Sequence, residues 1–177
     1  MASAFGHAVT AVALGNMYPE RMVSWKFWVL GAICAIMPDA DVVAFAFDIP
    51  YDHRWGHRGF THSLLFALIT GIVVTFLFFR NNLNTKMALG FILYFTLCTA
   101  SHGILDAMTT GGRGVAFFSP WNDARYFLPW RPIAVSPIGV GNFFSEWGRR
   151  VVLNELVWIG IPSMVFVVLG KIVKRRT

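Results

Sequence analysis

The chain has 177 residues, of which 56% are hydrophobic and 14% are charged, and its net charge is +6. A soluble domain carries about 25% charged residues, so this composition excludes an ordinary soluble protein and predicts one integral membrane domain over residues 1–177. The positive charge does not indicate a nucleic-acid partner, because much of it flanks apolar segments and no basic stripe or known reader motif is present.

Apolar segments predict an all-α membrane protein with about five transmembrane helices. They cover residues 3–18, 27–37 with a continuation at 42–47, 63–79, 87–108 and 145–170. Pro38 predicts a bend or break in the second helix, and Pro162 predicts a kink in the last one.

The longest connection, residues 109–144, is rich in glycine, proline and aromatic residues. A loop of this length in a compact protein is usually functional or disordered. Its aromatic side chains indicate packing on the membrane face, where we expect the loop to cap the site described below. Residues 115–118 also resemble a short strand of a hairpin.

Two further features bear on location and redox chemistry. Cys34 and Cys98 lie inside apolar segments without a CxxC spacing, so we expect them to pack as small hydrophobic residues. The N-terminal segment lacks a basic region and a small-residue cleavage motif, so we expect no cleavable signal peptide.

Basic residues in the short turns and the tail predict the orientation. If five helices alternate in direction, one side of the membrane holds Arg21, Lys26, Arg80, Lys86, Lys171, Lys174, Arg175 and Arg176. The positive-inside rule makes that side cytoplasmic. The C-terminus is then cytoplasmic, and the histidines and aspartates of the apolar segments lie near the outer, periplasmic face of a bacterial inner membrane.

Histidines and aspartates lie within the apolar segments or at their ends, where such side chains are costly and need partners. A divalent metal is the simplest partner for several imidazoles and carboxylates together. The candidate metal ligands are His7, Asp39, Asp41, His57, His62, His102 and Asp106.

His102 and Asp106 are four residues apart and therefore share one face of a helix. Such a pair can hold one metal ion. Alternatively, a neutral histidine could simply donate a hydrogen bond to the aspartate in an apolar wall.

Asp39 and Asp41 follow Pro38, and two carboxylates this close repel each other unless a cation or a proton lies between them. One of them could bridge two metal ions or act as a general base. The alternative is that one caps a helix and the other is solvated at the interface.

His57 and His62 stand just before the third apolar segment, either as metal ligands or as a pair of solvated interfacial histidines. Arg58 between them could clamp a phosphate or a carboxylate and stabilise developing negative charge. It could equally be an interfacial anchor. Glu155 is notable because it lies inside the last apolar segment.

Taken in order, the motifs are His7, Pro38-Asp39-x-Asp41, His57-Arg58-x-x-Thr61-His62-Ser63 and His102-x-x-x-Asp106. This series resembles the YdjM/YbcI-like family of bacterial inner-membrane proteins, to which metal-dependent hydrolysis is attributed. The resemblance covers nearly the whole chain and implies a metal site built from these residues. The motifs are also similar to those of zinc-dependent phospholipase C and S1/P1-type nucleases. Those enzymes have further ligands that this chain lacks, so one or two ions are expected.

These patterns lead to the hypothesis of a membrane-embedded, metal-dependent hydrolase, a phosphoesterase acting on a lipid or another amphiphilic substrate. Zn²⁺ suits a site of histidines and aspartates, and Mn²⁺ is the alternative. The catalytic candidates are Asp39, Asp41 and Arg58.

Two other functions use the same residues. A cation or proton transporter would place its ligands near the middle of the membrane with a path to both sides. A non-catalytic membrane protein would use the metal only to hold its helices together.

Overall fold

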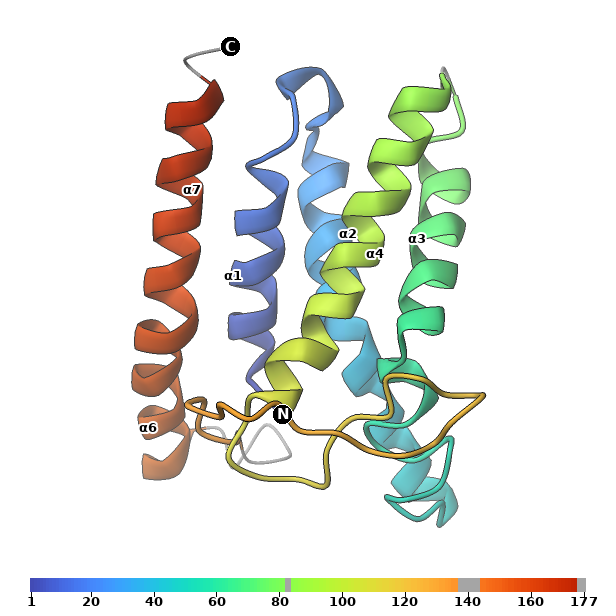
Figure 1. Ribbon diagram of the computed structural model, residues 1–177, viewed down its shortest axis with the longest axis vertical. Coiled ribbons are helices and arrows are strands. Elements are labelled where there is room, and N and C mark those ends of the chain that lie inside the picture. Colours follow the sequence, from blue (N-terminus) through green and yellow to red (C-terminus); the bar gives the residue numbers. More distant parts are fainter. Residues whose placement is uncertain (82–83, 137–143, 175–177) are drawn as a thin grey trace.

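The computed structural model describes residues 1–81, 84–136 and 144–174, and the regular structure within them is helical. The longer helical segments stand side by side with their axes roughly parallel (Figure 1). In chain order the elements are α1 (Ala4–Gly15), η1 (Glu20–Met22), α2 (Trp25–Ile36), η2 (Met37–Phe47), η3 (Phe60–His62), α3 (Leu64–Phe78), α4 (Thr85–Ala107), α6 (Glu146–Glu155), η4 (Leu156–Gly160) and α7 (Ile161–Lys174).

Three helical segments are long and apolar enough to cross a membrane by length and composition. They are Trp25–Phe47, Thr85–Ala107 and Glu146–Ile172, with mean hydropathies of 1.8, 1.6 and 2.0. The segments Ala4–Gly15 and Leu64–Phe78 are apolar but shorter. The all-helical prediction is therefore confirmed, whereas five complete spans remain a prediction.

Most helices begin at a polar residue whose side chain accepts a hydrogen bond from the first turn, as helix starts require. Ser24 does so for α2, which therefore begins two residues before the predicted start. The other capping residues are Ser3, Ser63, Asn84 and Ser145.

The predicted break at Pro38 is confirmed. The α-helix α2 ends at Ile36, and the chain continues as the 3₁₀ helix η2, with Pro38 in its first turn. The narrower 3₁₀ helix places three residues in each turn, and both Asp39 and Asp41 are buried.

The last helix is interrupted just before Pro162 rather than at it. The turn Leu156–Gly160 is π-helical and joins α6 to α7. Because Pro162 has no N–H to donate to the preceding turn, the regular α-helical ladder cannot continue through it. Turns of this kind are frequent at functional sites.

An aromatic cluster holds α2 against α4. The rings of Phe27 and Tyr94 stack with centroids 3.9 Å apart, and Phe91 and Phe95 pack beside them. Gly31 allows this contact, since a Cβ atom there would lie 2.1 Å from the Tyr94 hydroxyl oxygen. This packing fixes α4, which carries two of the candidate ligands.

The connection after α4 closes one end of the bundle (Figure 1). Its described part is irregular, with one bridge between Val115 and Tyr126 in place of the predicted hairpin and another between Thr109 and Ile133. The backbone N–H of Ala116 donates to the carbonyl oxygen of Arg58 over 3.0 Å, which ties the loop to the segment before η3. Residues 137–143 of the predicted loop lie outside the described residues.

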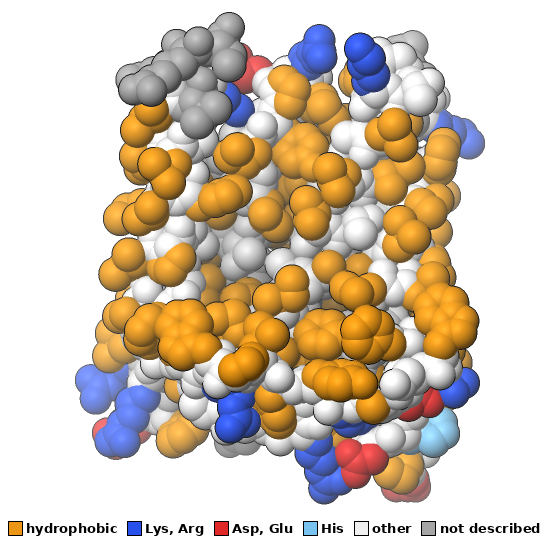
Figure 2. Space-filling view, in the orientation of Figure 1, with side chains coloured by type: hydrophobic (Ala, Val, Ile, Leu, Met, Phe, Trp, Pro, Cys, Tyr) orange, Lys and Arg blue, Asp and Glu red, His pale blue; other side chains and the backbone are white. Residues whose placement is uncertain are grey.

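Charge and hydrophobicity separate along the long axis. Hydrophobic side chains cover the middle of the face shown in Figure 2, while charged side chains gather at its two ends. This banding is what a membrane-spanning bundle requires.

Candidate metal centre

Four elements meet at the end of the bundle that the long loop closes (Figure 1). The first turns of α1 carry His7, η2 carries Asp39 and Asp41, η3 carries His62, and the last turns of α4 carry His102 and Asp106. All of these side chains are buried. Segments far apart in the sequence therefore place imidazoles and carboxylates at one level.

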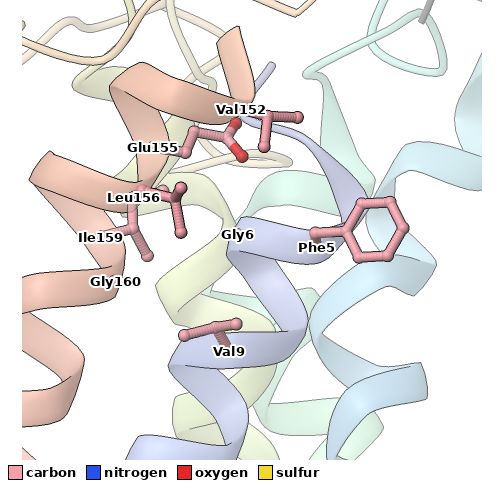
Figure 3. A pocket seen from close by; sticks show the side chains of 8 residues that line it. All are labelled: Phe5, Gly6, Val9, Val152, Glu155, Leu156, Ile159 and Gly160. Carbon is pink, nitrogen blue, oxygen red and sulfur yellow. The ribbon is translucent and has the colours of Figure 1, made fainter. Parts of the chain in front are cut away.

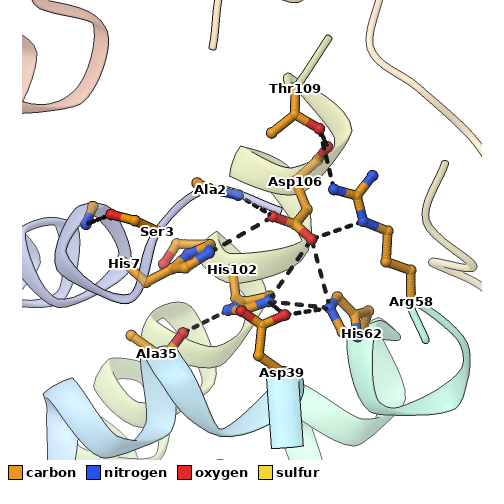
Figure 4. Close-up of polar contacts among 12 residues, drawn as sticks. Ala2, Ser3, His7, Ala35, Asp39, Arg58, His62, His102, Asp106 and Thr109 are labelled. Atoms are coloured by element: carbon orange, nitrogen blue, oxygen red, sulfur yellow. Dashed lines mark hydrogen bonds and ion pairs between the residues drawn. The ribbon is translucent and has the colours of Figure 1, made fainter. Parts of the chain in front are cut away.

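Asp39, His62, His102 and Asp106 converge on a common centre (Figure 4). Each offers one ligand atom, and these four atoms lie within 4.8 Å of one another. The Nε2 atoms of His62 and His102 are 3.1 Å apart, and His102 Nε2 is 3.2 Å from Asp39 Oδ1. Asp106 Oδ2 lies 3.7 Å from His62 Nε2.

These separations fit a metal ion. Ligand atoms about 2.0–2.2 Å from a tetrahedral zinc ion lie roughly 3.3–3.6 Å from one another. Asp39 Oδ1 and Asp106 Oδ2 are buried and accept no hydrogen bond of good geometry from the described residues. A cation at the centre would give Asp39 Oδ1 a partner and would add one to Asp106 Oδ2, which also faces Arg58 Nε at 2.9 Å.

The charges of these buried side chains also indicate a bound cation. Asp39, Asp41 and Asp106 are buried carboxylates, and Arg58 is the buried guanidinium beside them. With neutral imidazoles, these four described residues leave two negative charges uncompensated. A divalent cation balances them, and buried charges are normally paired or bound to metal.

The two central histidines are oriented for binding through Nε2. His102 Nδ1 lies 2.7 Å from the carbonyl oxygen of Ala35, which can only accept, so Nδ1 carries the hydrogen. His62 Nδ1 lies 3.2 Å from Asp41 Oδ2. Backbone carbonyls and carboxylates hold metal-binding histidines in this way.

Asp41 lies in a second group, with His57 and His62. Its Oδ1 atom is 2.6 Å from His57 Nδ1. Its Oδ2 atom accepts from the Thr61 hydroxyl over 2.7 Å and from the backbone N–H of Arg58 over 3.1 Å. Asp41 thus contacts the ring of His57 as well as that of His62.

The carboxylates also control the protonation of His62, in the short turn before α3. Burial lowers the pKa of His62, but its contacts with Asp39 and Asp41 and the charge of Asp106 outweigh burial and raise that pKa to about 9. The carboxylates therefore favour a positive charge at His62. A proton supplies this charge when no metal ion is bound.

Arg58 is fully buried, and its guanidinium faces Asp106 and the start of the long loop. Its Nε atom is 2.9 Å from Asp106 Oδ2. The terminal nitrogen atoms donate to the Thr109 hydroxyl and to the Gly111 carbonyl oxygen, over 3.1 and 3.0 Å. Arg58 thus joins α4 to the loop, and its role as a phosphate clamp stays a prediction.

His7 lies at the edge of the centre. Its ring stacks on that of His102 with centroids 3.7 Å apart, and its Nε2 atom is 3.6 Å from Asp106 Oδ1. Neither ring nitrogen has a hydrogen-bond partner among the described residues. Its ligand role also stays a prediction.

Backbone groups that the sequence does not single out complete the surroundings. The N–H of Ala2 donates to Asp106 Oδ1 over 2.8 Å, and the carbonyl oxygen of Ala35 holds His102. Contacts of backbone groups cannot be predicted from the residue types. Thr109 was also overlooked, although a threonine three residues after Asp106 is visible in the sequence.

Comparisons with known proteins identify the family of the chain. The family model described as YdjM inner membrane protein matches residues 1–176. The Escherichia coli (strain K12) protein called inner membrane protein YbcI is 35% identical over 167 residues, which is 93% of this chain and 94% of that protein. No solved structure matches the chain. The chain thus belongs to the YdjM family of inner membrane proteins, and it carries a buried cluster of histidines and aspartates that can hold a metal ion.

Proposed function

We propose that the protein is a metal-dependent hydrolase of the inner membrane, a phosphoesterase acting on a lipid or another amphiphilic substrate. The observation that carries the proposal is the convergence of Asp39, His62, His102 and Asp106 within 4.8 Å. Imidazoles with carboxylates suit Zn²⁺, and Mn²⁺ is the alternative. One ion would take these four ligands, and a second ion would use Asp41 and His57. His7, beside Asp106, would be a further ligand of the first ion.

A bound divalent ion would supply Lewis acidity toward a phosphoryl oxygen and lower the pKa of water. Asp39 is the most exposed of the four proposed ligands, at 8%, so we assign the approach of water and substrate to its side. Its carboxylate is our candidate for the proton acceptor. Arg58 would keep Asp106 ionised and in position.

The surroundings favour an amphiphilic substrate. Val43 and Phe47 on η2 and Leu64 at the start of α3 are exposed. They belong to the same elements as Asp39, Asp41 and His62, or lie next to them. A molecule reaching the centre along these elements would cross an apolar surface, which suits a lipid better than a small polar metabolite.

Metal analysis of purified variants tests the proposal. We expect His62→Ala and Asp106→Asn to lose most of the bound metal, because each removes a ligand from a site that needs all four. His53→Ala is the matched control, since His53 is exposed in the neighbouring loop. The measurement is elemental analysis, followed by a screen of phosphoester lipids. Full metal content in both ligand variants would contradict the proposal.

A further inference from the structure

The carboxylate of Asp106 has one oxygen atom at the proposed metal centre and one outside it (Figure 4). Oδ2 faces His62 and Arg58, at 3.7 and 2.9 Å. Oδ1 accepts a hydrogen bond from the backbone N–H of Ala2 over 2.8 Å and lies 3.6 Å from His7 Nε2. The torsion that turns an aspartate carboxylate has broad, roughly two-fold minima. The bond from Ala2 therefore helps to decide which oxygen atom a metal ion would meet.

The segment that donates this bond is also held by Glu155. The backbone N–H and the hydroxyl of Ser3 both donate to Glu155, one to each carboxylate oxygen. Figure 3 shows Glu155 reaching across from α6 toward the first turn of α1. Glu155 and Ser3 are both buried, and the α-ammonium of Met1 carries its charge near the carboxylates of Asp106 and Glu155. The residues before α1 are thus tied to two buried acids from different helices.

The last helical segment approaches α1 closely at this point. A Cβ atom on Gly6 would lie 2.8 Å from Ile159 Cδ1 and 3.1 Å from Glu155 Oε2, so any larger residue there would displace Ile159. Ile159 lies in the π-helical turn directly after Glu155 and packs with Ala2 in a buried cluster. Polar and apolar contacts from the last helical segment thus meet on the residues that precede α1.

A carboxylate is more than the packing of two helices requires. Taking a charge out of water is costly, and apolar contacts alone would join α1 to the last helix without that cost. Hydrogen bonds to a carboxylate are shorter and stronger than those to a neutral group, and Glu155 accepts two of them from Ser3. Such a pair of bonds fixes the backbone next to Ala2, and with it the direction of the Ala2 N–H.

We propose that Glu155 is a positioning residue of the metal centre, which acts through Ser3 and Ala2 to hold the carboxylate of Asp106. We assign it no contact with the metal ion or the substrate. The inference rests on the proposed function, because it takes Asp106 as a metal ligand. Residues that hold metal-bound side chains usually contribute about 10–100-fold to metal affinity. Because Glu155 acts through an intervening segment, we expect the lower end of that range.

The affinity of Glu155→Gln for Zn²⁺ tests the inference, measured on the full chain in detergent by competition with a chelating indicator. We expect about tenfold weaker binding than in the wild type, because glutamine replaces one of the two acceptor oxygen atoms with an NH₂ group. Glu146→Gln is the matched control and should bind as the wild type does. Glu146 begins the same helix, but it pairs with Arg150 at the surface.

Ser3→Ala tests the same contact from the other side, since it removes the hydroxyl donor. It should also weaken binding. The effects of Ser3→Ala and Glu155→Gln should combine to less than their product in the double variant, because both variants break the same contact.

The spectrum of bound Co²⁺ separates a positioning role from a purely structural one. Co²⁺ is another divalent ion that such ligands bind, and its visible absorption depends on how the ligands are arranged. We expect shifted bands in Glu155→Gln well below its melting temperature, because Asp106 is held less firmly. A residue that only joined two helices would lower the melting temperature and leave the spectrum of the folded protein unchanged. Ser3→Ala supplies the same measurement should Glu155→Gln not fold.

Wild-type affinity and spectrum in folded Glu155→Gln would overturn the inference and leave the metal centre in place. Losses that multiply fully in the double variant would do the same. Metal binding that depends on Glu155, in a protein that hydrolyses no phosphoester lipid, would support the positioning role and remove the hydrolase. A purified wild type without affinity for Zn²⁺ or Co²⁺ would overturn both proposals.

Discussion

Asp41 contacts four neighbours in and before the short helix η3. It meets His57, His62, Thr61 and the backbone of Arg58. Asp41 therefore links the 3₁₀ helix after Pro38 to the segment that carries His57 and His62. We regard it as the residue that sets the orientation of His62.

Asp41→Asn should lower metal affinity about 10–100-fold without abolishing binding, as loss of a carboxylate that orients a histidine usually does. Competition with a chelating indicator measures this. Asp48→Asn is the control, because Asp48 is exposed at the end of the same 3₁₀ helix, with a φ of 56° that asparagine tolerates. An unchanged affinity in Asp41→Asn would contradict the orienting role.

Metal binding should depend on pH through His62. Because the pKa of His62 is raised to about 9, the metal-free protein holds a proton there at neutral pH, and a metal ligand must release it. Affinity should therefore rise with pH up to about 9. Calorimetry in buffers of different ionisation enthalpy should detect one proton released at pH 7. Release of none would show that His62 is not a ligand.

At the scale of elements, the position of α4 depends on close packing against α2. Gly31→Ala should lower stability by about 1–3 kcal/mol, the usual cost of overpacking, because the new Cβ would meet the buried Tyr94 hydroxyl at 2.1 Å. Thermal unfolding in detergent measures it. Gly160→Ala, whose Cβ meets nothing closer than 3.7 Å, should be neutral or slightly stabilising. Equal melting temperatures for the two variants would contradict this explanation.

Much of this element structure follows from local chemistry in the sequence. Pro38 ends an α-helix because it lacks an N–H, and Ser63 caps α3 because its side chain accepts from the first turn. The gathering of His7, Asp39, His62, His102 and Asp106 at one end was also predictable from alternating spans. The pairs of atoms that face one another could not be predicted, because they depend on long-range packing, such as the contact of His102 with Ala35. The shape of the loop after α4 could not be predicted either, because its hydrogen bonds are made to backbone groups that are distant in the sequence.

At the scale of the whole molecule, the two ends differ in how their charges are balanced. The end with the site pairs Arg54 with Asp123, Arg58 with Asp106, Arg113 with Asp52 and Arg150 with Glu146. The described basic residues at the other end are Arg21, Lys26, Arg80, Lys86, Lys171 and Lys174, with Glu20 as the acid among them. Arg175 and Arg176 lie outside the described residues. This asymmetry supports the predicted orientation, with the second end cytoplasmic.

Cysteine labelling tests the orientation, since Cys34 and Cys98 are buried and contribute little background. In intact spheroplasts, a membrane-impermeant maleimide should label His53→Cys, which lies at the end with the site. It should label Asn81→Cys, in the turn after α3, only after the membrane is opened. The opposite pattern would place the site on the cytoplasmic face.

The contact between Ser3 and Glu155 joins residues 152 positions apart. During synthesis, the first helix is made long before its partner on α6 leaves the ribosome. Until then, the N-terminal segment that carries Ala2 and His7 lacks the contact between Ser3 and Glu155. We therefore expect the proposed metal centre, and any hydrolysis that depends on it, to be completed only at the last step of insertion.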